Sequence, residues 1–190
     1  YSKDAHIIIY NDKIVEKIQS AGAREPVSVL AKGILANEVG HAAFSKKYPP
    51  QIEETTVVAS TGNNVKVYHI GEAYSDLNSI RQGSFSSIII SATSAASVEQ
   101  YRYSAEILER GVRSFLVAAG KDGIIAQMNN TANYRTQQAD VRKVAMHFIN
   151  DPQYSALLKT HITNAYETAL KYDMKTMDTM KLSGLKIPKH

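Results

Sequence analysis

The chain has 190 residues, which is enough for one globular domain with its own hydrophobic core. It contains no cysteine, which excludes disulfides, thiolate nucleophiles and every zinc site that depends on sulfur. Hydrophobic residues make up 44% and charged residues 21%, an ordinary globular composition that argues against disorder. The net charge of +4 is too mild an excess to favour nucleic-acid binding. No apolar stretch has the length of a membrane span.

The N-terminal part of the chain is predicted to form two helices. Apolar residues recur in residues 2–20 at the three-and-four spacing of an amphipathic helix, at Ile7, Tyr10, Ile14, Val15 and Ile18. The run Ile7-Ile8-Ile9 is also compatible with the start of a strand. A break follows at Gly22, and Pro26 suits the first turn of a second helix that extends to about Phe44.

The middle of the chain is predicted to contain strands. Residues 55–61 and 65–70 are rich in β-branched side chains and flank Gly62-Asn63-Asn64, a short loop typical of hairpins. A short helix is expected over residues 73–80. The apolar run at residues 85–92 has the length and composition of a buried strand.

The C-terminal half is predicted to begin with a helix and a second hairpin. The helix covers residues 94–110 and ends at Gly111. Residues 113–119 and 123–128 are expected to pair around the Gly120–Gly123 turn. Two closing helices are expected over residues 133–149 and 152–172.

This order of elements predicts an α+β fold. Two hairpins and one further strand give a largely antiparallel sheet of about five strands, because a tight turn cannot join parallel strands. Helices would pack on this sheet, with a helical pair at each end of the chain. Residues 1–172 are expected to form the single domain, and the lysine-rich residues 173–190 a loosely ordered basic tail.

One string in the second predicted helix carries a candidate metal site. Asn37-Glu38-Val39-Gly40-His41 resembles the HExxH signature of zinc metallopeptidases, with Asn37 in place of the first histidine. In that signature two histidines one turn apart bind zinc, and the glutamate activates the metal-bound water. An amide is a poor zinc ligand, so Glu38 and His41 would need another ligand from elsewhere, such as His69 or His147. The other interpretation is an ordinary polar group on a helix surface.

The same helix carries a candidate interface. Four small residues recur three and four positions apart along one side of it: Gly33, Ala36, Gly40 and Ala43. Glycine inside a helix costs about 1 kcal/mol relative to alanine. Two glycines on one side therefore indicate that another backbone approaches closely, either that of the first helix or that of another subunit.

Three functions remain open from the sequence. The sequence contains no complete catalytic motif and predicts no cofactor. The row of small residues on the second predicted helix and the 11 tyrosines suit a contact surface. These features favour a non-catalytic binding or assembly module. Its partner would be another protein or further copies of itself. One version is the soluble part of a membrane-anchored bacterial surface, pilus or secretion component, outside the cytoplasm, whose anchor precedes Tyr1. The alternatives are a degenerate metallopeptidase-like hydrolase using Glu38 and His41, and a sensor module that binds a small molecule in an apolar pocket.

Overall fold

The computed structural model describes residues 11–95, 99–131 and 133–182, and within these ranges the chain is almost entirely helical. The elements in chain order are α1 (Asn11–Ser20), α2 (Val27–Lys47), α3 (Pro50–Glu53), β1 (Thr56–Val58), β2 (Asn64–Lys66), α4 (Val67–Arg81), α5 (Phe85–Ala95), α6 (Glu99–Ala118), α7 (Asp122–Asn129), α8 (Tyr134–Ile149) and α9 (Ser155–Leu182). No helix within these ranges is both long enough and apolar enough to cross a membrane.

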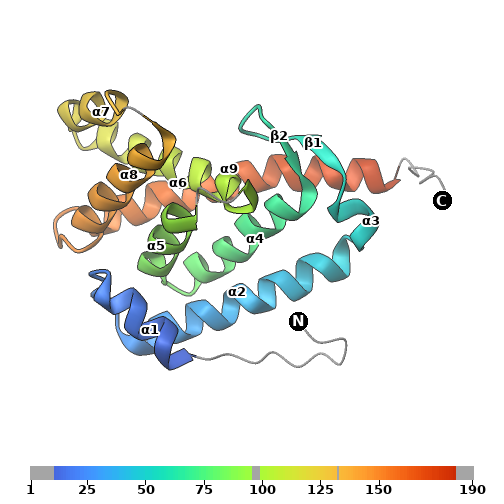
Figure 1. Cartoon of the computed structure of the whole chain (residues 1–190), viewed down its shortest axis with the longest axis horizontal. Coiled ribbons are helices and arrows are strands. Elements are labelled where there is room, and N and C mark those ends of the chain that lie inside the picture. The colour runs from blue at the N-terminus through green and yellow to red at the C-terminus, as the bar shows by residue number, and fades with distance from the viewer. Residues whose placement is uncertain (1–10, 96–98, 132, 183–190) are drawn as a thin grey trace.

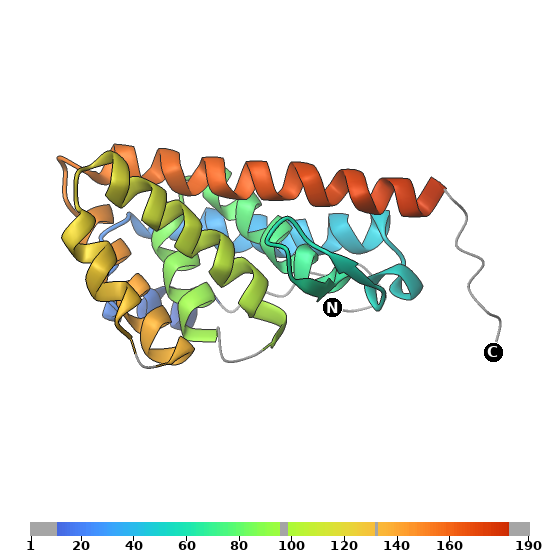
Figure 2. The ribbon, with the colours of Figure 1, turned by 90° about the horizontal axis from the view of Figure 1, so that it is seen from above.

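The helices form a bundle around α4. This helix contacts α2, α6 and α9, and its buried side chains include Val67, Ile70 and Leu77. The longest helix, α9, runs along one side of the molecule, with α7 and α8 near one of its ends and the hairpin toward the other (Figures 1 and 2).

The predicted five-stranded sheet is wrong. The described residues contain one small antiparallel hairpin of three residues per strand, in which Val57 pairs with Val65. The first predicted hairpin is therefore present in shortened form. Residues 67–70, expected in its second strand, form the first turn of α4.

The predicted strand at residues 85–92 is a helix, α5. It is buried on nearly every side, with Ile88, Ile89 and Ile90 each at most 6% exposed. A helix surrounded by other helices has no polar face, so its sequence lacks the three-and-four pattern that identifies an amphipathic helix.

The predicted second hairpin is also helical. Residues 113–118 continue α6, and residues 123–128 lie in α7. Gly111 does not end the preceding helix but lies inside α6, where an added Cβ would come 2.9 Å from the Cα of Ile162 in α9. This glycine permits close helix packing, which the sequence pattern alone does not distinguish from a helix stop.

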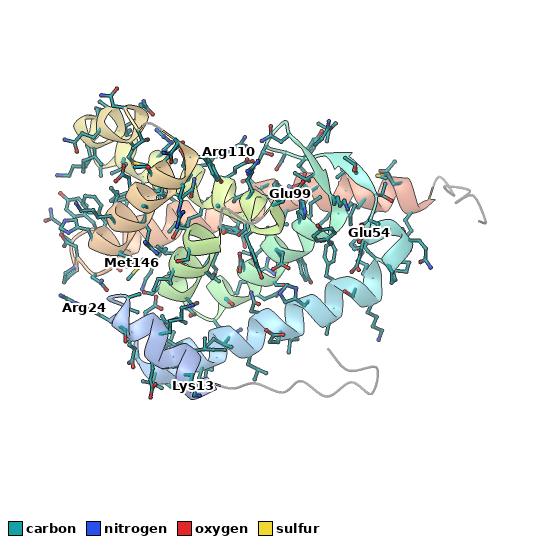
Figure 3. The ribbon with its side chains drawn as sticks, in the orientation of Figure 1. Lys13, Arg24, Glu54, Glu99, Arg110 and Met146 are labelled. Carbon is teal, nitrogen blue, oxygen red and sulfur yellow. The ribbon has the colours of Figure 1, made fainter. Side chains whose placement is uncertain are left out.

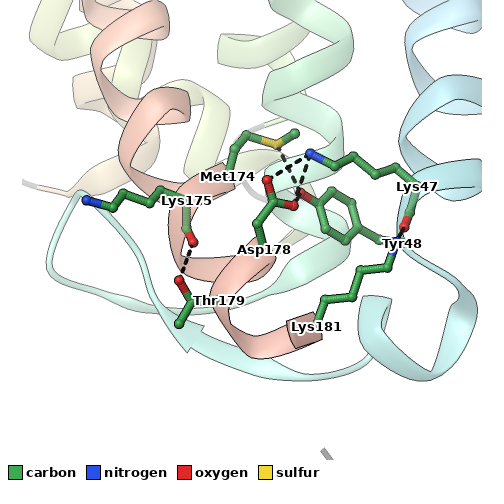
Figure 4. A network of polar contacts seen from close by, with 7 residues as sticks. All are labelled: Lys47, Tyr48, Met174, Lys175, Asp178, Thr179 and Lys181. Carbon is green, nitrogen blue, oxygen red and sulfur yellow. Dashed lines mark hydrogen bonds and ion pairs between the residues drawn. The ribbon is translucent and has the colours of Figure 1, made fainter. Parts of the chain in front are cut away.

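The long C-terminal helix includes residues that the sequence analysis assigned to a tail. Residues 173–182 belong to α9, and Asp173 is 2% exposed. Near this end, Asp178 accepts hydrogen bonds from the Tyr48 hydroxyl at 2.7 Å and from Lys47 Nζ at 3.0 Å (Figure 4). Lys181 Nζ also donates to the carbonyl oxygen of Lys47 at 3.1 Å. These contacts join the end of α2 to α9.

Close packing at Gly33 leads to a stability prediction. A Cβ added to Gly33 in α2 would lie 2.1 Å from Cβ of Ser84, so the two segments would have to separate. We expect Gly33→Ala to lower the free energy of unfolding by about 1–3 kcal/mol, the usual cost of overpacking. Urea denaturation would measure this change.

Gly123→Ala is the matched control for this substitution. Gly123 lies in α7, and an added Cβ meets nothing within 4 Å. This substitution should leave stability unchanged or raise it, because alanine restricts the unfolded chain. Equal effects of the two substitutions would show that the α2 contact does not require glycine.

Candidate functional site

The main candidate site is an open cavity of about 550 Å³ beside α2, α4 and α5, which we call the α2–α4 cavity. Its apolar wall consists of isoleucines from three helices: Ile14 and Ile18 of α1, Ile34 of α2, and Ile88 and Ile90 of α5. Its polar end includes Asn37, Glu38 and His41 of α2 together with Glu72 and Asp76 of α4, and Lys17 of α1 adds one basic side chain to the lining. An apolar cavity with a few convergent polar groups is typical of a ligand site.

Helix geometry and one glycine bring the polar groups together. Asn37 and His41 are four residues apart on α2, as are Glu72 and Asp76 on α4, so each pair lies on one side of its helix. Gly40 allows the two helices to approach, since an added Cβ would lie 2.8 Å from the Cα of Ser75.

His41 and Glu72 bring an imidazole and a carboxyl group close together in the cavity. The distance from His41 Nε2 to Glu72 Oε2 is 3.6 Å, which is too long for a good hydrogen bond. Burial raises the pKa of Glu72 to about 7, and the negative charges of Asp76 and Glu38 add to this effect. Burial lowers the pKa of His41, which favours a neutral imidazole. The pair is therefore not a fixed ion pair near neutral pH.

Asn37 is held by a buried carboxyl group. Its Nδ2 donates a hydrogen bond of 3.1 Å to Oδ1 of Asp76, while the Ser104 hydroxyl donates to the other oxygen of Asp76. Ser104 also forms a hydrogen bond of 2.7 Å with the hydroxyl of Tyr166. Burial raises the pKa of Asp76 to about 7, although its two hydrogen bonds lower it in part.

The residues present do not complete a zinc site. Catalytic zinc has three protein ligands, and two histidines with one glutamate are a common set. His41 and Glu72 would provide two of these ligands, but Asn37 occupies the place of the third and its nitrogen has no lone pair for a metal. The described residues include no group of three histidine, cysteine, aspartate or glutamate side chains placed to hold a metal.

The two histidines considered as additional ligands lie elsewhere. His69 lines a second cavity beside the hairpin, and His147 of α8 lines cavities formed with α7 and with Arg24. The carboxyl group in contact with His41 comes instead from Glu72 of α4, and Asp76 lies one turn further along the same helix. Neither residue is among those predicted from the sequence. Their four-residue spacing could have indicated them if residues 67–72 had been read as helix.

The small residues of α2 have different surroundings. Gly33 faces Ser84, and Gly40 faces Ser75 and Asn78 of α4, so both glycines serve contacts within this chain. Ala36 is half-buried, whereas Ala43 is exposed. The glycines therefore pack against α4 and against Ser84 in the connection between α4 and α5, rather than against the first helix.

Comparisons with known proteins add no identification. No protein-family model matches the sequence, and searches of curated proteins and of solved structures likewise gave no match.

Proposed function

We propose that this protein is a non-catalytic binding module that holds a peptide segment of a partner protein in the α2–α4 cavity. The observation that carries the proposal is the hydrogen bond from Asn37 to Asp76. This hydrogen bond holds the Asn37 amide at the position where the HExxH signature has its first metal ligand. The cavity beside Asn37 is open. The arrangement therefore favours binding over hydrolysis.

The lining of the cavity indicates the chemistry of the ligand. The isoleucine wall suits an apolar side chain, and burial of such a side chain contributes about 1.5–3 kcal/mol. Glu38 and Glu72 at the polar end suit a basic group of the same ligand. A peptide with an apolar residue near a lysine or arginine matches both ends.

Blocking the cavity from an exposed position tests this proposal. Ser91 of α5 is exposed and lines the cavity, so a tryptophan there should occupy the space of the ligand with little effect on the core. We expect wild-type protein to enrich sequences from a displayed hexapeptide library and to leave them intact. Ser91→Trp should lower the affinity for the best peptide about tenfold or more, because the ligand would lose a buried side-chain contact. Isothermal titration calorimetry would measure both affinities.

Ser28→Trp is the matched control. Ser28 is also an exposed helical serine, but it lies outside the cavity lining, so its substitution should not change the affinity. Failure to enrich any peptide, or equal binding by Ser91→Trp and wild type, would contradict the proposal. Binding of a small apolar molecule in place of peptides would favour the sensor alternative.

A hydrolase is the second candidate, supported by the position of Glu72 beside His41. Together with Glu38, these residues place two carboxyl groups and an imidazole at one end of the cavity. This candidate predicts cleavage of the bound peptides, detected by mass spectrometry, and loss of cleavage in His41→Ala. Intact peptides after prolonged incubation with added zinc would exclude it in favour of the binding module.

A further inference from the structure

A second cavity, of about 300 Å³, lies between the β1–β2 hairpin and α6, and we call it the hairpin cavity. Asn63, Asn64 and Val65 line it from the hairpin side, and His69 lines it from α4. The remaining lining residues come from α6: Glu99, Arg102, Tyr103 and Glu106. Glu99 lies close to the hairpin, far from the α1–α2 connection that carries Arg24 (Figure 3).

His69 provides a buried polar atom that lacks a partner. The residue is 2% exposed, and within the described ranges its Nε2 has no hydrogen-bond partner. A buried polar atom without a partner costs about 1–3 kcal/mol, so such atoms are rare unless they serve another purpose. Burial lowers the pKa of His69, so the neutral ring can offer one donor and one acceptor to a ligand.

The charged groups of the cavity are of both signs and are not paired with each other. Glu99, Arg102 and Glu106 follow one another at three and four residues on one side of α6. Nevertheless, Arg102 forms no ion pair within 4 Å in the part of the chain that the structure describes, and its guanidinium lies 5.3 Å from the centre of the Tyr134 ring. Glu106 accepts a hydrogen bond of 3.0 Å from Asn63 Nδ2, which fixes its position at the hairpin.

We propose that the hairpin cavity binds a free α-amino acid in its zwitterionic form. The planar guanidinium of Arg102 suits a carboxylate, which it can bind through two parallel hydrogen bonds. The carboxylate of Glu99, one helical turn before Arg102 on α6, suits the ammonium group, while Glu106 is already held by Asn63. His69 also lines the cavity, and its Nε2 is available for a further hydrogen bond to the ligand. A volume of about 300 Å³ fits a ligand of this size.

The other simple ligands match fewer of these features. A metal ion does not account for Arg102, and the described residues offer no three-ligand set for it. A simple anion would not use the charge of Glu99, and a simple amine would leave the Tyr134 ring as the nearest neighbour of the Arg102 guanidinium. A ligand with both charges matches both Glu99 and Arg102.

A panel of the twenty common amino acids, measured by isothermal titration calorimetry against the full chain, tests this proposal. At least one of them should bind, whereas acetate and methylamine, which carry one charge each, should not. Arg102→Gln and Glu99→Gln should each weaken that binding about tenfold or more, because each removes a charged hydrogen-bond partner at an exposed position. Circular dichroism would verify that both variants are folded.

Two controls separate this site from the rest of the molecule. Arg24→Gln removes an exposed arginine far from the hairpin and should not change the binding of the amino acid. Ser91→Trp, which blocks the α2–α4 cavity, should also leave it unchanged, so this proposal and the proposed peptide binding can fail independently. Absence of binding by all twenty amino acids, equal binding of acetate or methylamine, or undiminished binding by Arg102→Gln would overturn the proposal.

Discussion

Asn37→His should convert the α2–α4 cavity into a zinc site. The new histidine would lie one helical turn before His41 on the same side of α2, and Glu72 Oε2 is already 3.6 Å from His41 Nε2. Two histidines and a glutamate are an established ligand set for catalytic zinc. Asp76, which now accepts a hydrogen bond from Asn37, would accept one from the new imidazole and orient it, as carboxylates beside zinc ligands commonly do.

The expected effect is large and depends on the metal. At about a hundredfold excess of free zinc over the dissociation constant, binding would stabilise the variant by about 2.7 kcal/mol. For a chain of this size that corresponds to a rise in Tm of roughly 5–10 °C. Native mass spectrometry would detect one zinc ion per chain, and thermal denaturation with and without zinc would measure the shift.

The wild type and a double variant show whether zinc binding depends on the new histidine and on Glu72. The wild type should show no such shift, because Asn37 offers no nitrogen lone pair. The double variant Asn37→His/Glu72→Gln should lose most of the gain, because an amide replaces the carboxylate ligand. If the double variant binds zinc as tightly as Asn37→His, Glu72 is not a ligand and the placement of α4 beside His41 has no bearing on the metal.

The amphipathic helices were the part of the fold that the sequence could predict. In α1 and α6, polar residues on the solvent side alternate with buried ones such as Val15 and Leu108, and this periodicity is visible without a structure. In α5 nearly every side chain is buried, so the sequence shows only an apolar run, which a strand would show equally well. The prediction of a sheet followed from that ambiguity and from reading Gly111 as a helix stop.

The site was predictable only on the side contributed by α2. Glu38 and His41 belong to one short string, whereas their neighbours Glu72 and Asp76 are more than thirty residues away along the chain. The β-branched residues 65–70 favour a strand, and this interpretation puts Glu72 at the edge of a predicted helix rather than on a side facing α2. Recognising the pair also requires the contact between α2 and α4, which depends on Gly40 and cannot be read from either helix alone.

The buried carboxyl groups of α4 should make the protein less stable as the pH rises from about 4 to about 7. In the folded protein the pKa values of Asp76 and Glu72 are both raised to about 7, mainly by burial. Folding therefore favours the protonated forms. Their contribution to the free energy of unfolding is fully present below the ordinary carboxyl pKa of about 4. It declines as the pH rises toward 7 and is lost above the pKa values of the folded protein. For Asp76 alone the loss is at most about 4 kcal/mol.

Asp76→Asn separates this effect from the general response of the protein to pH. The amide can still accept the hydrogen bond from Asn37 and can donate to Ser104, so the packing around position 76 should persist while the titrating group is removed. We expect urea denaturation across this pH range to show a clearly flatter dependence in Asp76→Asn than in the wild type. Asp122→Asn, at an exposed carboxyl of α7, should retain the wild-type slope. If wild-type stability instead rises with pH relative to that of Asp76→Asn, Asp76 is ionised in the folded protein, and the hydrogen bonds from Asn37 and Ser104 outweigh the effect of burial.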